Sequence, residues 1–335
     1  MMSRIDPADV TASFVPAGSG QDLIMFSLVN LLPLLHTGGP EPTGPTYSHW
    51  VLDPKIALYV FGVTALYLLW VGPLNRRRPG IEERPVEPRQ IRWFLAGSVF
   101  ALIALGPPID DWSDWFFASV HMFQHLLLIL VVVPCWLAGI PAWVYRPIFA
   151  NRWTSVAFRT LVHPVVAFVL ASMIMVLWHL PVIYDAALTN DMIHAVEHQF
   201  FLLTGFLIWW PVMSKVPEAP ALKTPLNCMY LFVLMIPSGI VGAFITLAGT
   251  GLYSGYADAS VRPFGLDLKN DQEIAGLLMW VGMNFVFVVV ISILFLRWAT
   301  RQEKADREAT RIHPRAARTL PVTGGATLST TDRQP

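Results

Sequence analysis

The chain has 335 residues, of which 54% are hydrophobic and 14% are charged, and its formal net charge at pH 7 is zero. Soluble domains carry about 25% charged residues, so this composition excludes an ordinary soluble protein and predicts a polytopic membrane protein. The absence of a net basic charge argues against a nucleic-acid partner, and the widely spaced Cys135 and Cys228 offer neither a disulfide framework nor a thiolate metal clamp.

Seven apolar stretches of about 20 residues follow one another along the chain, which is the length an α-helix needs to cross a bilayer. Prolines at or near their ends are typical of helix boundaries. Because a spanning backbone must satisfy its own hydrogen bonds, such long continuous stretches predict helices. The predicted spans are residues 54–74, 92–109, 114–138, 162–181, 192–213, 226–248 and 274–297.

Basic residues are concentrated in every second connection, and this bias predicts the orientation of the helices. The first, third and fifth connections and the C-terminal segment are rich in Arg and Lys, whereas "DDWSD" and "YDAALTND" contain neither. We therefore predict an all-α, seven-helix transmembrane bundle over residues 51–298. Its N-terminus would lie outside, its C-terminus would lie in the cytoplasm, and its outer surface would contact membrane lipid.

The two ends of the chain differ from this bundle. Residues 1–50 form an N-terminal extension whose apolar run, residues 23–35, has the length of a signal-peptide core or an interfacial segment. Asp22 precedes that run, which favours a translocated, loosely structured start over a cleaved signal. Residues 299–335 are charged and then rich in Ser, Thr and Gly, which predicts a disordered basic cytoplasmic tail.

Five histidines lie within the apolar stretches, where an ionisable group needs a partner or a ligand to offset its desolvation. At about 1.5 Å of rise per residue and in the predicted orientation, all five fall in the outer half of the membrane. They are His121 and His125 in "SVHMFQHLLLIL", His179 in "VLWHLPVIY", and His194 and His198 in "MIHAVEHQFFLL".

The i, i+4 spacing within each pair stacks both imidazoles on one helix face, as a metal ion bound by a helix requires. Neutral imidazole is a ligand for copper, zinc and iron. We therefore predict a metal site that is open to the outer side and built from His121, His125, His179, His194 and His198. Glu197, Asp271 and Gln272 are predicted to orient the ligating imidazoles by hydrogen bonding.

Purely structural roles are the alternative interpretation for these histidines and for the nearby methionines. Any single histidine could instead be a core residue hydrogen-bonded between helices. Met122, Met192 and Met283 lie at heights suitable for a Cu(I) ligand, but packing is the favoured interpretation for each of them.

Five motifs follow one another over about residues 50–298: "HMFQHLLL", "HPVVAF", "WHLPVIYDAALTNDMIHAVEHQFFLLTGFLIWWPV", "LAGTGLYSGY" and "NDQEIAGLLMWVGMNF". They resemble the successive motifs of the CtaG family, bacterial seven-helix membrane proteins implicated in assembling copper-containing caa-type cytochrome c oxidases. The resemblance implies a non-enzymatic assembly factor of the bacterial inner membrane. It also implies copper as the metal, and oxidase subunits or other copper-handling proteins as partners. The matching positions are His121, His125, His179, His194, Glu197, His198, Asp271 and Gln272.

Two other functions fit parts of the pattern. A b-type haem protein, acting as an electron carrier or oxidoreductase, needs one histidine on each of two facing helices. An intramembrane metalloprotease is suggested by "HAVEH", which has the H-x-x-E-H form of inverzincins, with Glu197 as general base and Glu273 as a distant ligand. The protease interpretation leaves the histidines at 121, 125 and 179 without a role.

Overall fold

The computed structural model describes residues 46–312 apart from 77–85, 258 and 260, and this part of the chain is helical and contains no strand. The predictions on residues 1–45, on the central part of the first basic connection and on residues 313–335 lie outside the described residues. Within the described part, the predicted all-helical fold is confirmed.

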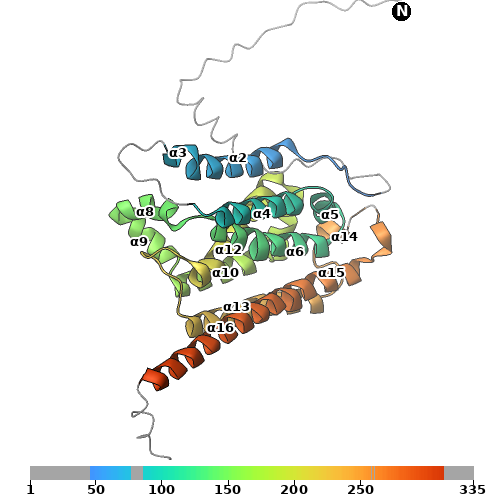
Figure 1. The fold of residues 1–335 in the computed structure, drawn as a ribbon. Coiled ribbons are helices and arrows are strands. Elements are labelled where there is room, and N and C mark those ends of the chain that lie inside the picture. The colour runs from blue at the N-terminus through green and yellow to red at the C-terminus, as the bar shows by residue number, and fades with distance from the viewer. Residues whose placement is uncertain (1–45, 77–85, 258, 260, 313–335) are drawn as a thin grey trace, which may run out of the picture.

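Each of the seven predicted stretches falls on a helical segment (Figure 1). In chain order these are α2 (Pro54–Val71) with α3 (Pro73–Arg76), α4 (Pro88–Leu105), α6 (Ala118–Leu127) continued by η1 (Leu128–Val132) and α7 (Val133–Gly139), α10 (Pro164–Trp178), α12 (Asp191–Met213), α13 (Thr224–Leu247), and α15 (Leu268–Leu277) continued by η4 (Leu278–Gly282) and α16 (Met283–Ile312).

Among the described residues, five segments are long and apolar enough to cross a membrane: Pro54–Asn75, Pro88–Trp115, Ala118–Gly139, Thr224–Leu247 and Leu268–Ala309. A sixth is added if α9 (Arg152–Leu161) and α10, which meet at a bend of 65°, count as one span. Helix α12 is not among them, because its first half carries His194, Glu197 and His198, which lower its hydropathy. The fold therefore belongs to a membrane protein, and the seven-span count stays a prediction.

Short helices gather at the two ends of the bundle. Helix α5 (Ile109–Trp115), α14 (Ser254–Ala257) and the start of α15 lie at one end in Figure 1. Helices α8 (Arg146–Ala150) and α9 lie at the other, where the C-terminal part of α16 also points. The acidic segment of α5 and the arginines of α8 and α9 are thus at opposite ends, and which end faces the cytoplasm stays a prediction. Helix α11 (Pro181–Thr189), η2 (Ala142–Tyr145) and η3 (Pro263–Gly265) complete the connections.

The disordered tail predicted from residue 299 is wrong for its first part, because α16 continues to Ile312. This segment, "ATRQEKADREATRI", is rich in Ala, Glu, Lys and Arg, which have high helix propensity. Arg307 and Glu303 also form an i, i+4 ion pair on its surface. Charge alone is thus a poor indicator of disorder when the charged residues are also good helix formers.

The helices that carry the paired histidines start at defined positions and pack closely. The side chain of Asn190 caps α12 by accepting hydrogen bonds from Met192 N at 3.0 Å and Ile193 N at 3.1 Å. A Cβ added to Gly205 of α12 would lie 2.9 Å from Cγ2 of Val133, so glycine lets α12 approach α7. These two constraints fix the height and the distance of α12 relative to the helix of His121.

Two π-helical segments, η1 and η4, interrupt the third and seventh predicted spans. In η1 a local cause is visible, because Pro134 has no N–H to donate to the carbonyl four residues earlier. Segments of this kind are rare and often lie at functional sites. Both lie level with the buried histidines: η1 begins three residues after His125.

Candidate metal centre

His121 and His125 of α6 meet Glu197 of α12 in the interior of the bundle. Each residue offers one ligand atom to a group whose atoms all lie within 4.8 Å of one another. His121 Nε2 is 3.6 Å from Glu197 Oε2, and His125 Nε2 is 4.0 Å from Glu197 Oε1. All three side chains are buried. We refer to these three residues as the metal centre.

The arrangement follows from helical spacing on two facing helices. His121 and His125 are one turn apart on α6, and His194, Glu197 and His198 lie on one face of α12. The ring centroids of His121 and His194 are 5.3 Å apart, and those of His125 and His198 are 5.6 Å apart. Four imidazoles therefore form two facing pairs, and the carboxylate of Glu197 lies against the pair on α6.

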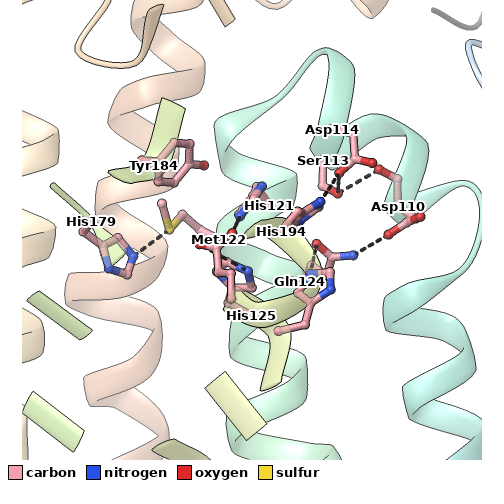
Figure 2. A network of polar contacts seen from close by, with 12 residues as sticks. Asp110, Ser113, Asp114, His121, Met122, Gln124, His125, His179, Tyr184 and His194 are labelled. Atoms are coloured by element: carbon pink, nitrogen blue, oxygen red, sulfur yellow. Dashed lines mark hydrogen bonds and ion pairs between the residues drawn. The ribbon is translucent and has the colours of Figure 1, made fainter. Parts of the chain in front are cut away.

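Each of the two histidines of α12 has a polar contact beside the metal centre, and Figure 2 shows the one between His194 and Asp114. His194 Nδ1 lies 3.5 Å from Asp114 Oδ1, and His198 Nε2 lies 3.4 Å from the side-chain oxygen of Gln124. The Gln124 amide is held in turn, because it donates to Asp110 Oδ1 at 3.0 Å. These two histidines thus pack against the metal centre, and each has a ring nitrogen near a neighbouring acidic or amide group.

Tyr256 of α14 sets the orientation of the His121 ring. Its hydroxyl donates to the carbonyl oxygen of Ser113 at 2.6 Å and lies 3.2 Å from His121 Nδ1. Burial raises the pKa of the Tyr256 hydroxyl well above its usual value, so the hydroxyl stays neutral. With its single proton used on Ser113, the hydroxyl accepts from Nδ1–H of His121, which leaves the lone pair on Nε2, facing Glu197.

The fifth predicted histidine, His179, lies apart from the metal centre. Its Nδ1–H donates to the carbonyl oxygen of Met175 at 2.6 Å, and its Nε2 lies 3.3 Å from the sulfur of Met122. Figure 2 shows this contact on the side of α6 away from Asp114. The structure therefore brings His121 and His125 together with Glu197, places His194 and His198 beside them, and directs His179 elsewhere.

Asp271 and Gln272 hold the elements that surround the centre: within the described residues, their side chains bond to backbone groups and to Ser119, and not to the ligand atoms. The Asp271 carboxylate accepts from Ala118 N at 2.8 Å and from Ser119 N at 3.1 Å, and so caps the first turn of α6 from a different helix. The Gln272 side-chain oxygen accepts from Gly251 N at 3.1 Å and Leu252 N at 3.0 Å. These bonds fix α6 and the loop that leads to Tyr256.

The polar atoms of the centre fit a bound ion. His121 Nε2, both ring nitrogens of His125 and both oxygens of Glu197 are buried without a hydrogen-bond partner among the described residues. An unpaired buried polar group costs about 1–3 kcal/mol, and such groups in a native protein call for an explanation such as an ion. Metal bonds to imidazole and carboxylate are about 2.0–2.2 Å long, so a small contraction of the group would bring all three donors onto one ion.

The haem and protease interpretations fit the geometry less well. A bis-His haem needs a nitrogen of each facing imidazole directed at one iron, whereas His194 Nδ1 lies 3.5 Å from Asp114 Oδ1 and His198 Nε2 lies 3.4 Å from the side-chain oxygen of Gln124. In an inverzincin, the two histidines of "HAVEH" would hold the metal and the glutamate between them would act on a bound water. Here Glu197 instead joins the histidines of α6, a different helix.

Several residues around the centre were not identified from the sequence as site residues. In the sequence, Asp114 served only as part of an acidic loop that indicates the orientation of the helices, and Gln124 and Tyr256 had no assigned role. Tyr256 lies in "LAGTGLYSGY", one of the five quoted motifs, so its motif was found without its function. The contact between Met122 and His179 joins residues from two helices, and no local spacing encodes it.

Comparisons with known proteins identify one family. The model of the family described as "Cytochrome c oxidase caa3 assembly factor (Caa3_CtaG)" matches residues 65–301. Two curated relatives, an uncharacterised protein of Mycobacterium bovis and one of Mycobacterium tuberculosis, are each 24% identical over 237 residues. The match covers 66% of this chain and 35% of each relative, so the chain spans about a third of their length. No solved structure matches.

Proposed function

This chain belongs to the family of cytochrome c oxidase caa3 assembly factors, and from that premise we propose that it binds copper at the metal centre and supports insertion of copper into the oxidase. The observation that carries the proposal is the convergence of unpaired, buried donor atoms from His121, His125 and Glu197. It acts as an assembly factor and not as an enzyme. Copper is its cargo.

The donor set supports copper as the cargo. Imidazole is a good ligand for copper, and a site of given nitrogen and oxygen donors binds Cu²⁺ more tightly than the other divalent first-row metals. Glu197 supplies a negative charge that offsets part of the cost of burying a cation. Three protein donors leave a coordination position for a further ligand, through which copper can enter from one protein and leave to another.

The surrounding residues keep the donors in place for this exchange. Tyr256 directs the lone pair of His121 toward Glu197, and Asp271 holds the start of α6. Outer hydrogen bonds of this kind fix the tautomer and orientation of a ligating imidazole. The partners are subunits of the oxidase or other copper-handling proteins. In the predicted topology, the chain lies in the bacterial inner membrane and receives copper from its outer side.

Metal analysis of the purified full-length protein tests this function. After loading with copper and removal of excess metal, His121→Ala and Glu197→Gln should each lose most of the copper that the unchanged protein retains. His163→Ala is the matched control, because His163 is an exposed residue that precedes α10 far from the centre. Equal copper retention in all these variants would show that the buried histidines are packing residues.

A further inference from the structure

Four buried methionines from four different elements line one small cavity next to the metal centre. They are Met122 of α6, Met175 of α10, Met279 of η4 and Met283 of α16. His179 and His125 complete the polar part of the lining. We call this cavity, with its four methionines and His179, the methionine pocket. It has about 10 Å³ of free space for a water-sized body, enough for one ion but not for an organic cofactor.

The ring of His179 presents an unprotonated nitrogen to this pocket. The carbonyl oxygen of Met175 can only accept, and it lies 2.6 Å from Nδ1, so the Nδ1 nitrogen carries the proton. In the neutral imidazole, Nε2 then carries a lone pair. Its neighbour at 3.3 Å is the sulfur of Met122, which is also an electron-pair donor. A second proton on the ring would place a charge in a buried apolar site at a large desolvation cost.

Two electron-pair donors that contact each other at the wall of one cavity supply part of the donor set that a metal site requires. The described residues that line the pocket include no carboxylate, and its donors are neutral thioethers and imidazoles. Thioether sulfur selects soft ions such as Cu(I), and neutral donors in an apolar site favour a single positive charge over a double one. We propose that the methionine pocket is a second metal site, which takes a soft monovalent ion of the Cu(I) type through His179 Nε2, the Met122 sulfur and further methionine sulfurs.

The position of the pocket relates it to the metal centre. His125 belongs to the metal centre and also borders the pocket, so the two sites share one side chain. The inference thus deepens the proposed function and rests on it for the identity of the cargo. The pocket would hold copper in its monovalent form, beside a centre whose carboxylate suits a divalent ion.

Methionine also serves as a flexible filler of membrane bundles, and two observations distinguish this pocket from filler. A filler methionine would not need the lone pair of a buried histidine directed at its sulfur, as Met122 has. Both π-helical segments border the pocket, η1 through Ile129 and η4 through Met279. Irregular helix on two sides of the same cavity agrees with a site that positions side chains for a ligand.

Silver binding to the purified full-length protein tests the pocket, because Ag(I) is soft, monovalent and redox-inert. Cysteine also binds Ag(I), so all variants carry Cys135→Ala and Cys228→Ala. In this background, Met122→Leu and Met283→Leu should each weaken Ag(I) binding by at least about tenfold, the loss that removal of even an outer partner of a metal ligand can produce. Leucine nearly preserves the volume of methionine, so folding should survive.

The control is Met173→Leu, which changes an exposed methionine two residues from Met175 on the same helix. It should leave Ag(I) binding unchanged, and X-ray absorption at silver should show sulfur neighbours in the control that diminish in Met122→Leu. Equal Ag(I) affinity and equal sulfur scattering in Met122→Leu, Met283→Leu and Met173→Leu would overturn the proposal.

A parallel titration with Ni(II) separates the pocket from the metal centre, because Ni(II) prefers nitrogen and oxygen donors. We expect Met122→Leu to keep Ni(II) binding and Glu197→Gln to lose it while keeping the sulfur-bound silver. Retained nickel binding in Glu197→Gln, together with weakened silver binding in Met122→Leu, would support the pocket and contradict the metal centre. Lost nickel binding in Glu197→Gln, together with undiminished silver binding in Met122→Leu, would support the centre and contradict the pocket.

Discussion

His121 Nε2 lies 3.6 Å from Glu197 Oε2, and both side chains are fully buried. Since the Tyr256 hydroxyl accepts a hydrogen bond from Nδ1–H of His121, Nε2 carries a lone pair, and the atoms that face each other are two electron-pair donors. A proton shared between them would draw them to hydrogen-bond distance, below about 3.2 Å. The longer distance is what a site for a cation between two donors would show.

The charge of Glu197 is therefore expected to matter more than its shape. Glu197→Gln preserves the side-chain volume and removes the negative charge, so the affinity for divalent copper should fall by more than about tenfold. Competition with a chelator of known affinity measures this loss. Glu218→Gln, which neutralises an exposed carboxylate beyond the end of α12, is the control and should bind copper normally. Equal affinities in the two variants would remove Glu197 from the ligand set.

Tyr256 should act on copper binding through His121. Tyr256→Phe removes the hydroxyl that contacts His121 Nδ1, and we expect copper affinity to fall by about tenfold. It also leaves the carbonyl oxygen of Ser113 without this donor, at a stability cost of about 1–3 kcal/mol. Tyr67→Phe is a matched control, because it also removes a hydroxyl bonded to a buried carbonyl, that of Gly139, but in another part of the bundle. Both variants should unfold at lower temperature, and only Tyr256→Phe should bind copper more weakly.

Spacing along one helix was sufficient to predict part of the candidate site. The i, i+4 pairs at His121 and His125 and at His194 and His198 are local features, and the structure places them on facing helices. The rotation of α12 about its axis is not local, because it depends on contacts such as that of Gly205 with Val133. Sequence alone therefore assigned Glu197 to an orienting role, whereas the structure places its oxygens among the candidate ligand atoms.

The position of His179 illustrates a different limit. It follows the last residue of α10, where the carbonyl of Met175 lies free to accept from a side chain. The ring turns back to that carbonyl, so its second nitrogen faces Met122 and not Glu197. Its position near the end of a predicted span put His179 at the height of the other histidines, and it does border one cavity with His125, but the direction of its ring depended on the helix end.

Topology can be tested at α12, whose hydropathy is too low for its length and composition alone to identify a span. The concentration of basic residues predicts that Asp185 lies outside and Lys215 lies in the cytoplasm. Alkaline phosphatase fused after Asp185 should be active, because the enzyme folds only outside the cytoplasm, and a fusion after Lys215 should be inactive. Equal activity of the two fusions would mean that α12 does not cross the membrane.

Asp271 should contribute to stability and to metal binding together. Its carboxylate accepts from the backbone N–H groups of Ala118 and Ser119 at the start of α6. Loss of an N-cap costs about 0.5–2 kcal/mol, so Asp271→Ala should lower the thermal unfolding temperature. It should also weaken copper binding, because the first turn of α6 precedes His121. Asp53→Ala removes the side chain that caps α2 by accepting from Lys55 N, and it should lower stability without affecting copper. Unchanged copper binding in both variants would show that Asp271 contributes to stability and not to metal binding.

A strain that lacks this protein should make the oxidase polypeptides but contain an oxidase with too little copper and low activity. His125→Ala should reproduce this defect while the protein still inserts into the membrane, because His125 belongs to the metal centre and borders the methionine pocket. Added external copper should restore part of the activity, since mass action can replace a step that raises the local occupancy of a metal site.

Copper content of the isolated oxidase, measured beside its polypeptide level and activity, distinguishes this defect from a loss of electron supply. An electron carrier would leave a fully metallated oxidase that lacks electrons. A copper-replete, active oxidase in the deletion strain would contradict the assembly function, whatever ion the centre holds.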